Sequence, residues 1–264
     1  MDTTTAAVIG ARHLRVARNG QDAAAAASGP GWAAAVVCDG CSAGAHSEVG
    51  ARLGAAIVVA ALARRLANQQ LVGRTHEPST HAQTTHEPAT RLWTEVEAEV
   101  IAALAALADR MGEDRVRTVV EHFLFTIVAV AATREATSVW AIGDGAYSFG
   151  EHTRVLGPFA ENQPPYLGYA LLGAAPRAHV ETAPAGTRIV AVATDGALDL
   201  GGDVARFAQP RYLEHADRAR RELSVMARGR EVIDWNERRV VRTAELQDDC
   251  AIAVIRVPQP ERRP

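Results

Sequence analysis

Apolar residues in the first part of the chain fall into two short continuous runs and one longer periodic segment. Residues 5–10 and 32–38 have the length and the apolar content of buried strands, and the polar segment RVARNGQDA between them predicts a turn. Apolar residues then recur at helical spacing behind Ser47, a residue type that caps helices, which predicts a helix over residues 47–67. The order is therefore strand, turn, strand, tight loop, helix.

The same two patterns continue to the C-terminus. Helical periodicity predicts a second helix over residues 92–111, and the segment 203–228 is helical in character. Segments dense in β-branched and aromatic residues predict strands at 123–132, 137–149, 178–183, 187–194 and 250–257. No composition shift marks a domain boundary, so we expect residues 1–264 to form one domain with two groups of helices and many strands.

One segment, residues 73–90, departs from both patterns. It is rich in proline and threonine, has no apolar periodicity and contains the tetrapeptide THEP twice. This composition cannot bury enough apolar surface to order a chain, so we expect a disordered insertion. The segment carries His76, His81 and His86, which makes metal binding conceivable, but a solvated insertion is the simpler interpretation.

Composition and charge exclude several classes of partner. The net charge is −3 and lysine is absent, which gives no electrostatic case for binding nucleic acid or an anionic membrane. No apolar run is long enough to span a bilayer, and the N-terminus lacks the design of a signal peptide. Three cysteines are too few for a disulfide framework and fit a reducing cytoplasm.

Cys38 and Cys41 form a lone C-x-x-C pair. Together with Cys250 and His46 they could supply four zinc ligands, and on their own they could form a redox pair. Cys38 ends one apolar run and Cys250 opens another. Free cysteine commonly behaves as a small buried hydrophobe. We therefore favour a structural role for these cysteines.

Aspartates at the edges of apolar runs are the main chemical signal in the sequence. An isolated Asp-Gly pair is usually a plain turn. Here, however, widely separated segments place carboxylates against apolar runs without neighbouring arginines, which calls for compensation of their charge. Oxygen ligands without histidine favour Mg²⁺ or Mn²⁺ over zinc. The set comprises Asp22, Asp39, Asp144, Asp195, Asp199, Asp248 and Asp249.

The ordered motifs GQDA, CDGCSAGAHSEVGA, AIGDGAYS, TDGALDL and QDDCAIAVI resemble those of the metal-dependent protein phosphatases of type 2C, in particular a bacterial subgroup with Gln-Asp-Ala in its first motif. The resemblance extends from about Val8 to Val257. It implies an α+β fold, a four-layer α-β-β-α sandwich of two antiparallel sheets flanked by helices. It also implies hydrolysis of phosphoserine and phosphothreonine in proteins that a kinase has phosphorylated.

The resemblance further implies a role for each motif residue. Asp39 would bridge two Mn²⁺ or Mg²⁺ ions, Gly40 would add its carbonyl oxygen, and Asp22 would orient water. The remaining ligands would be Asp195 and Asp248 for the binuclear site, and Asp144 and Asp199 for a possible third ion. The loop with Pro164 and Tyr166 falls where the family carries a flap beside the active site.

Three positions depart from the family pattern. Gln21 replaces a glutamate, so one ligand charge is missing, and Cys41 replaces a histidine that is a proposed proton donor. The arginine that grips phosphate would fall on Ala17, and Arg15 or Arg18 is expected to substitute for it. Two other interpretations therefore remain open: a pseudophosphatase that binds phosphoproteins without turnover, and an unrelated metal-binding protein whose acids are turn residues.

Overall fold

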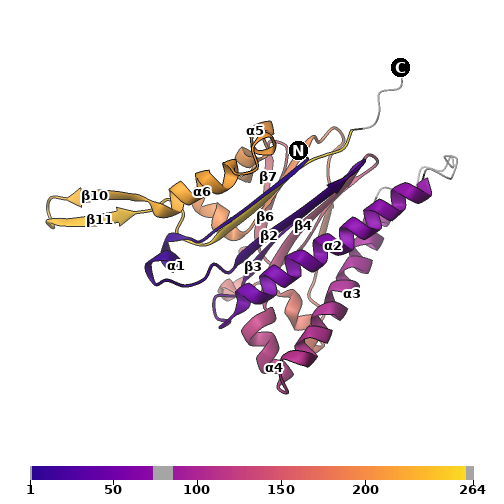
Figure 1. Ribbon diagram of the computed structural model, residues 1–264, viewed down its shortest axis with the longest axis horizontal. Helices are drawn as coiled ribbons and strands as arrows, with labels where there is room; N and C mark the ends of the chain where they lie inside the picture. Colours follow the sequence, from indigo (N-terminus) through magenta and orange to yellow (C-terminus); the bar gives the residue numbers. More distant parts are fainter. Residues whose placement is uncertain (1, 74–85, 260–264) are drawn as a thin grey trace.

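The computed structural model describes residues 2–73 and 86–259. Two antiparallel five-stranded sheets lie face to face, and helices cover the outer face of each sheet (Figure 1). The expected four-layer α-β-β-α arrangement is confirmed. No helix in the described ranges has the length and apolarity needed to cross a membrane.

The first sheet contains, in spatial order, β1 (Thr3–Val8), β12 (Cys250–Arg256), β9 (Ile189–Ala193), β6 (Gly145–Phe149) and β7 (His152–Leu156). The second contains β2 (Asp22–Gly29), β3 (Trp32–Gly40), β4 (Phe125–Thr133), β5 (Thr137–Ile142) and β8 (His179–Thr182). A separate two-stranded ribbon is formed by β10 (Arg230–Asp234) and β11 (Arg239–Thr243).

The long helices α2 (Ser47–Gly73) and α3 (His86–Met111) pack on the second sheet. They are followed by α4 (Arg115–Thr118) and a π-helical turn, η1 (Val119–Phe123). The first sheet is covered by α5 (Pro210–Glu214) and α6 (Arg218–Arg228), with the short α1 (Ala11–Arg15) at one end. Short 3₁₀-helices are η2 (Ala160–Asn162), η3 (Leu167–Leu172), η4 (Asp195–Leu200) and η5 (Val204–Phe207).

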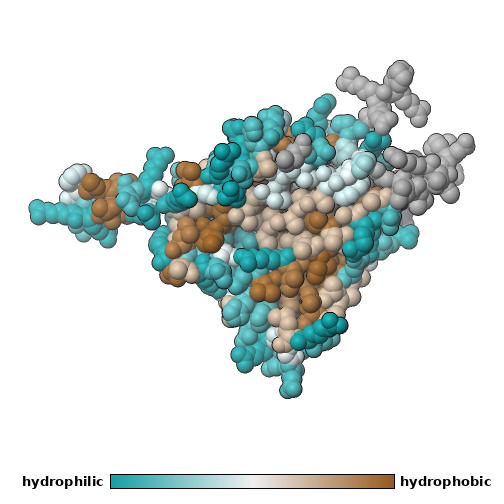
Figure 2. Space-filling view, viewed as in Figure 1, coloured by the Kyte–Doolittle hydropathy of each residue, from teal (hydrophilic) through white to brown (hydrophobic). Residues whose placement is uncertain are grey.

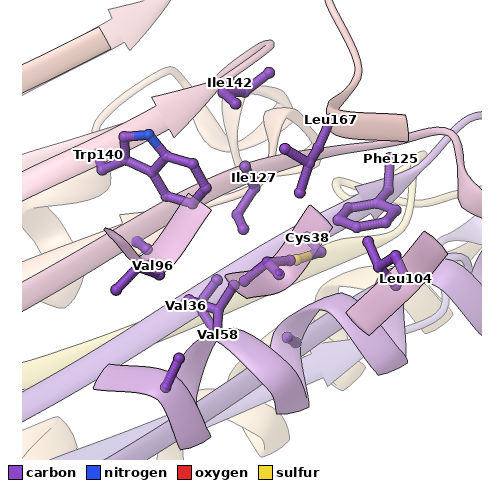
Figure 3. Packing of buried hydrophobic residues seen from close by; sticks show 14 of the residues in the cluster. Val36, Cys38, Val58, Val96, Leu104, Phe125, Ile127, Trp140, Ile142 and Leu167 are labelled. Carbon is purple, nitrogen blue, oxygen red and sulfur yellow. The ribbon is translucent and has the colours of Figure 1, made fainter. Parts of the chain in front are cut away.

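The central strands are apolar on both faces because each face meets a different layer of the core. In β3, Val36 and Cys38 face α2 and α3, whereas Ala35 and Val37 face the other sheet. Figure 3 shows Val36 and Cys38 among side chains from the helices and from β4, including Ile127. The continuous apolar runs of the sequence are thus explained by burial on both sides.

Cys38 and Cys250 are both fully buried in the apolar core, which confirms their interpretation as buried hydrophobes. Cys41 is half-buried at the end of β3, and all three thiols are free. The cysteines therefore contribute packing to the two helix-covered layers of the core.

Three sequence predictions were wrong. The predicted polar turn includes the last residue of α1 and the start of β2, an alanine-rich strand that exists because it pairs along its whole length with β3. The predicted strand 137–149 is two strands, β5 and β6, which a turn at Gly143 sends into different sheets. Residues 86–90 of the predicted insertion belong to α3. The rest of that insertion, with His76 and His81, lies outside the described residues.

Candidate active site

Asp22 and Asp39 stand opposite each other at the ends of β2 and β3. The register of this strand pair fixes them side by side. Thr194, at the end of β9 in the other sheet, donates its hydroxyl to Asp22 Oδ2 at 2.5 Å and accepts the backbone N–H of Ala251 at 2.8 Å. The two sheets are therefore tied together at the pair of carboxyl groups.

Burial and mutual repulsion raise the pKa values of these acids. The pKa of Asp39 lies well above its usual range, because the side chain is buried and because Asp22 and Asp195 are close. Burial also raises the pKa of Asp22 to about 8, with further increases from Asp249 and Asp195. The pKa of Asp195 rises to about 6 through burial and the charges of Asp144 and other acids. These carboxyl groups form one electrostatic cluster.

Asp144 enters this cluster from the turn between β5 and β6. Gly143 and Gly145 on either side adopt left-handed φ angles of 96° and 126°. A Cβ at Gly143 would lie 2.5 Å from a methyl carbon of Thr126, so only glycine fits this turn. Burial raises the pKa of Asp144, and its Oδ1 is buried without a hydrogen-bond partner among the described residues.

Asp195 begins η4 directly after β9, and the next residue must be glycine. A Cβ at Gly196 would lie only 1.8 Å from the carbonyl oxygen of Asp249. Asp199, in the same turn, accepts the backbone N–H groups of Gln247 and Asp248 at 2.9 and 3.1 Å through one oxygen. That oxygen of Asp199 therefore holds the segment that carries Asp248.

Asp248 is half exposed, and its Oδ1 accepts the backbone N–H of Asp249 at 2.9 Å. Its other oxygen lies 3.9 Å from the guanidinium of Arg12. Asp248 therefore lies at the solvent-exposed side of the buried acids. Its Oδ1 is engaged with the backbone, and its Oδ2 is directed toward Arg12.

Asp249, which sequence reasoning gave no role, organises the base of the site. Its Oδ1 accepts the N–H of Gly10 at 2.8 Å, and its Oδ2 contacts the N–H of Gln21 at 2.7 Å and His13 Nδ1 at 2.8 Å. One buried carboxyl group thus joins the ends of β1, α1, β2 and β12. Its place directly before the apolar run of β12 was the available signal in the sequence, but Asp248 has nearly the same place.

The two candidate arginines lie on different sides of the site. Arg15 donates to Gln247 Oε1 at 2.9 Å, next to Asp248. Arg18 donates to the carbonyl oxygen of Ser42 at 2.9 Å, and so touches the loop that follows Gly40. Ala17 between them adopts a left-handed φ of 52°, which ends α1 and lets the two side chains diverge.

Gln21 uses its side-chain amide as a donor. Nε2 donates to the carbonyl oxygen of Cys41 at 3.1 Å and to the hydroxyl of Ser47 at 2.5 Å. Tyr166 comes from the predicted flap loop and lies against Cys41; burial and this contact raise the pKa of its hydroxyl. Tyr166 therefore brings the loop close to Cys41, Asp39 and Asp144.

The residues fit a divalent cation in chemistry. The donors are oxygens, and the unpartnered Oδ1 of Asp144 is buried. The main groups that lower the pKa values of Asp22, Asp39 and Asp195 include no positively charged side chain. Among residues 2–73 and 86–259, however, no three His, Cys, Asp or Glu side chains are already gathered around one ion position.

We expect the stability of the metal-free protein to fall as pH rises from 5 to 8. In the unfolded chain these carboxyl groups lose their protons near pH 4, whereas folded Asp22 keeps its proton up to a pKa of about 8 and Asp195 up to about 6. The folded state therefore binds more protons in this window, and raising the pH favours unfolding. Urea titrations with a chelator at several pH values measure this slope.

Mn²⁺ should reverse the trend, because an ion favours the carboxylate form that high pH supplies. Asp22→Asn should flatten the slope in the chelated protein, and the exposed Asp217→Asn should not. A chelated protein with the same free energy of unfolding at pH 5 and pH 8 would contradict the raised pKa values.

The sequence profile of protein phosphatase 2C matches residues 9–231. The chain belongs to the protein phosphatase 2C family. Among curated proteins, none matches it in sequence. The family match spans the strands and turns that carry Asp22, Asp39, Asp144 and Asp195, and stops before Asp248.

Solved phosphatase structures share the fold of this family member at low sequence identity. A serine-threonine phosphatase 2C from Toxoplasma gondii has a TM-score of 0.59 and 13% identity, covering 97% of this chain and 94% of that one. PppA, a regulatory component of T6SS in Pseudomonas aeruginosa, has a TM-score of 0.52 and 14% identity, covering 96% of each chain. The photosystem II phosphatase PBCP has a TM-score of 0.51 and 14% identity, covering 97% of this chain and 98% of that one. At these identities the likeness concerns the fold alone.

Proposed function

We propose that the chain hydrolyses phosphoserine and phosphothreonine in proteins with water activated at a binuclear Mn²⁺ or Mg²⁺ site. The observation that carries this proposal is the cluster of buried acids at the strand ends, whose pKa values are raised by burial and by each other. A cation is the compensation that such a cluster lacks. We assign the ligands to Asp39, the carbonyl of Gly40, Asp195 and Asp248.

Two divalent ions, when bound, lower the pKa of a shared water and neutralise the charge on phosphate. The residues of the chain supply the positions. Asp22, held by the Thr194 hydroxyl, keeps Asp39 in place and orients water beside it. Asp144 and Asp199 are assigned to a third, weaker ion, for which Asp199 has one oxygen left, since its other oxygen accepts two backbone N–H groups.

Phosphate recognition falls to Arg15 or Arg18. Both are close to the acidic cluster, and their partners are neutral oxygens, so neither guanidinium is neutralised by its hydrogen bonds. A planar guanidinium binds two phosphate oxygens at once. Alanine substitution of the one that grips phosphate should raise KM more than it lowers kcat.

The second candidate function is a pseudophosphatase that binds phosphoproteins without turnover. Gln21 favours it, because its amide is engaged with Cys41 and Ser47 where the family pattern has a metal-linked glutamate. Cys41 also stands in place of the expected proton donor. The retained set of Asp39, Asp195 and Asp248 favours catalysis.

Hydrolysis of p-nitrophenyl phosphate and of phosphothreonine peptides, with Mn²⁺, with Mg²⁺ and with a chelator, separates the candidates. A phosphatase releases phosphate only when the ion is present. A pseudophosphatase binds the phosphopeptide in a titration but releases no phosphate with either ion. Turnover that persists in the chelator would contradict the metal-dependent proposal.

Gln21→Glu should destabilise the protein by about 1–2 kcal/mol, since a carboxylate would face the Cys41 carbonyl oxygen without a donor. This differs from what ligand charge alone predicts, which is tighter metal binding. Urea unfolding measures the loss, and the exposed Gln259→Glu is the control. A lower half-saturating Mn²⁺ concentration with unchanged stability would mean that residue 21 contacts the metal shell.

A further inference from the structure

The ribbon of β10 and β11 projects from the body of the molecule at the end where α1 lies (Figure 1). We call residues 230–243 the arm. Its two strands pair only with each other within the described chain. Ile233 is 50% exposed, Val240 62%, and Trp235 at the tip 76%. Figure 2 shows apolar side chains gathered on the arm, apart from the rest of the surface.

Both faces of the arm carry an apolar pair. Ile233 pairs with Val240 on one face, and Val232 with Val241 on the other. Each strand also has an outer edge whose N–H and C=O groups pair with no further strand among residues 2–73 and 86–259. A two-stranded ribbon is marginally stable in water, and exposed edges and apolar patches usually mark a surface that another chain covers. The arm therefore has the features of a binding element.

The base of the arm is joined to the candidate active site. Thr243, the last residue of β11, precedes Asp248 by five positions, which places it within about 17 Å of that residue. Between them, the carbonyl oxygens of Leu246 and Gln247 accept the N–H groups of Ala11 and Arg12. A chain bound along the arm would thus lie within reach of the acids.

Charge indicates the kind of chain that fits. Next to the acidic cluster, the segment 10–21 holds Arg12, Arg15 and Arg18 and no acid. Residues 228–243 carry five arginines against three acids, and Arg242 pairs with Glu231. The other four arginines make no ion pair with any residue that the structure describes: Arg228, Arg230, Arg238 and Arg239. An acidic partner with alternating apolar residues complements this surface.

We propose that the arm docks an extended, acidic and apolar segment of the phosphoprotein substrate, which adds as a strand to an open edge of the arm. This proposal rests on the proposed phosphatase function. Main-chain hydrogen bonds would supply affinity, and alternate side chains would cover the Ile233–Val240 pair. Val240 precedes Asp248 by eight positions, so the docked segment and the phosphorylated residue lie at most about eight extended residues apart.

The test compares an arm variant with a matched control. Ile233→Thr with Val240→Thr keeps β-branched side chains but removes apolar surface from one face. Val155→Thr, at an exposed valine on the edge strand β7, is the control. In the first phosphothreonine peptide, the sequence Val-Glu-Val-Glu-Val stands on each side of the phosphothreonine, separated from it by an eight-residue Gly-Ser spacer. The second carries only Gly and Ser there.

We expect the arm variant to lose about tenfold in kcat/KM on the first peptide, mainly through KM, as expected for roughly 1.4 kcal/mol of binding. Its rates on the second peptide and on p-nitrophenyl phosphate should equal those of the parent and of Val155→Thr. Equal rates of parent and arm variant on the first peptide would overturn the proposal. So would a parent dimer that the arm substitutions convert to monomer, because the arm would then join two copies.

Binding can be read without turnover. Trp235 is exposed, whereas Trp32, Trp93 and Trp140 are buried, so a blue shift of tryptophan emission reports on the arm. The first peptide, added to Asp39→Asn, should produce this shift and the second should not. If no substrate is hydrolysed by the parent but the shift occurs, docking stands and the phosphatase function fails. Hydrolysis without the shift rejects docking and leaves the phosphatase function intact.

Discussion

Asp39→Asn is expected to reduce metal-dependent hydrolysis by at least about a thousandfold without unfolding the protein. Asp39 is buried close to Asp22, Asp195 and Asp144, and as the proposed bridging ligand its loss would weaken the hold on both proposed ions at once. In the chelated protein the same change should raise stability at pH 8, because a neutral amide replaces a buried group that Asp22 and Asp195 repel. Activity and stability would therefore move in opposite directions.

Steady-state rates on p-nitrophenyl phosphate at saturating Mn²⁺, together with urea unfolding in a chelator, measure both effects. Asp195→Asn should behave in the same way, since its pKa is also raised. Asp217→Asn, at an exposed aspartate beside Arg220, should change neither quantity. Turnover near that of the parent in Asp39→Asn would rule out the binuclear assignment.

Asp249→Ala should have the largest effect on stability, a loss of about 3–5 kcal/mol. The substitution leaves the buried N–H groups of Gly10 and Gln21 without an acceptor and removes the contact to His13. Each unsatisfied buried group costs about 1–3 kcal/mol. Urea unfolding at pH 6 measures the loss.

The neighbouring residue provides the control for this prediction. Asp248→Ala removes a half-exposed side chain with one backbone contact, and its cost should be about 1 kcal/mol or less. If the two alanine variants were equally stable, Asp249 would not be the anchor of the four segments that meet there.

The layers of the fold could be predicted from the sequence because burial on both faces leaves a plain apolar run. The runs at β3, β4, β9 and β12 were read directly. β2 was missed because its alanines favour helices and only pairing with β3 makes it a strand. β10 and β11 were missed because their mixture of arginines and valines contributes to no core.

At the site, Asp-Gly pairs and motif order were enough to collect the acids that the fold brings together. The sequence could not separate Asp248 from Asp249, since both precede the same strand and only the direction of each side chain distinguishes them. It also could not show that Gln21 donates to Cys41, because that contact depends on how β2 meets the end of β3. Contacts between distant segments, rather than residue types, decide these roles.

The order of strands in the first sheet has a consequence for how the chain is made. β12 lies between β1 and β9, although it follows both of them in the chain and therefore leaves the ribosome after them. The strands β2 to β5, with α2 and α3, are complete once Ile142 has been synthesised, more than a hundred residues before β12 begins. β1, in contrast, has no strand to pair with until residues 250–256 emerge. A nascent chain therefore carries β1 without its partner strand until β12 emerges, and Asp248 and Asp249 arrive only together with β12.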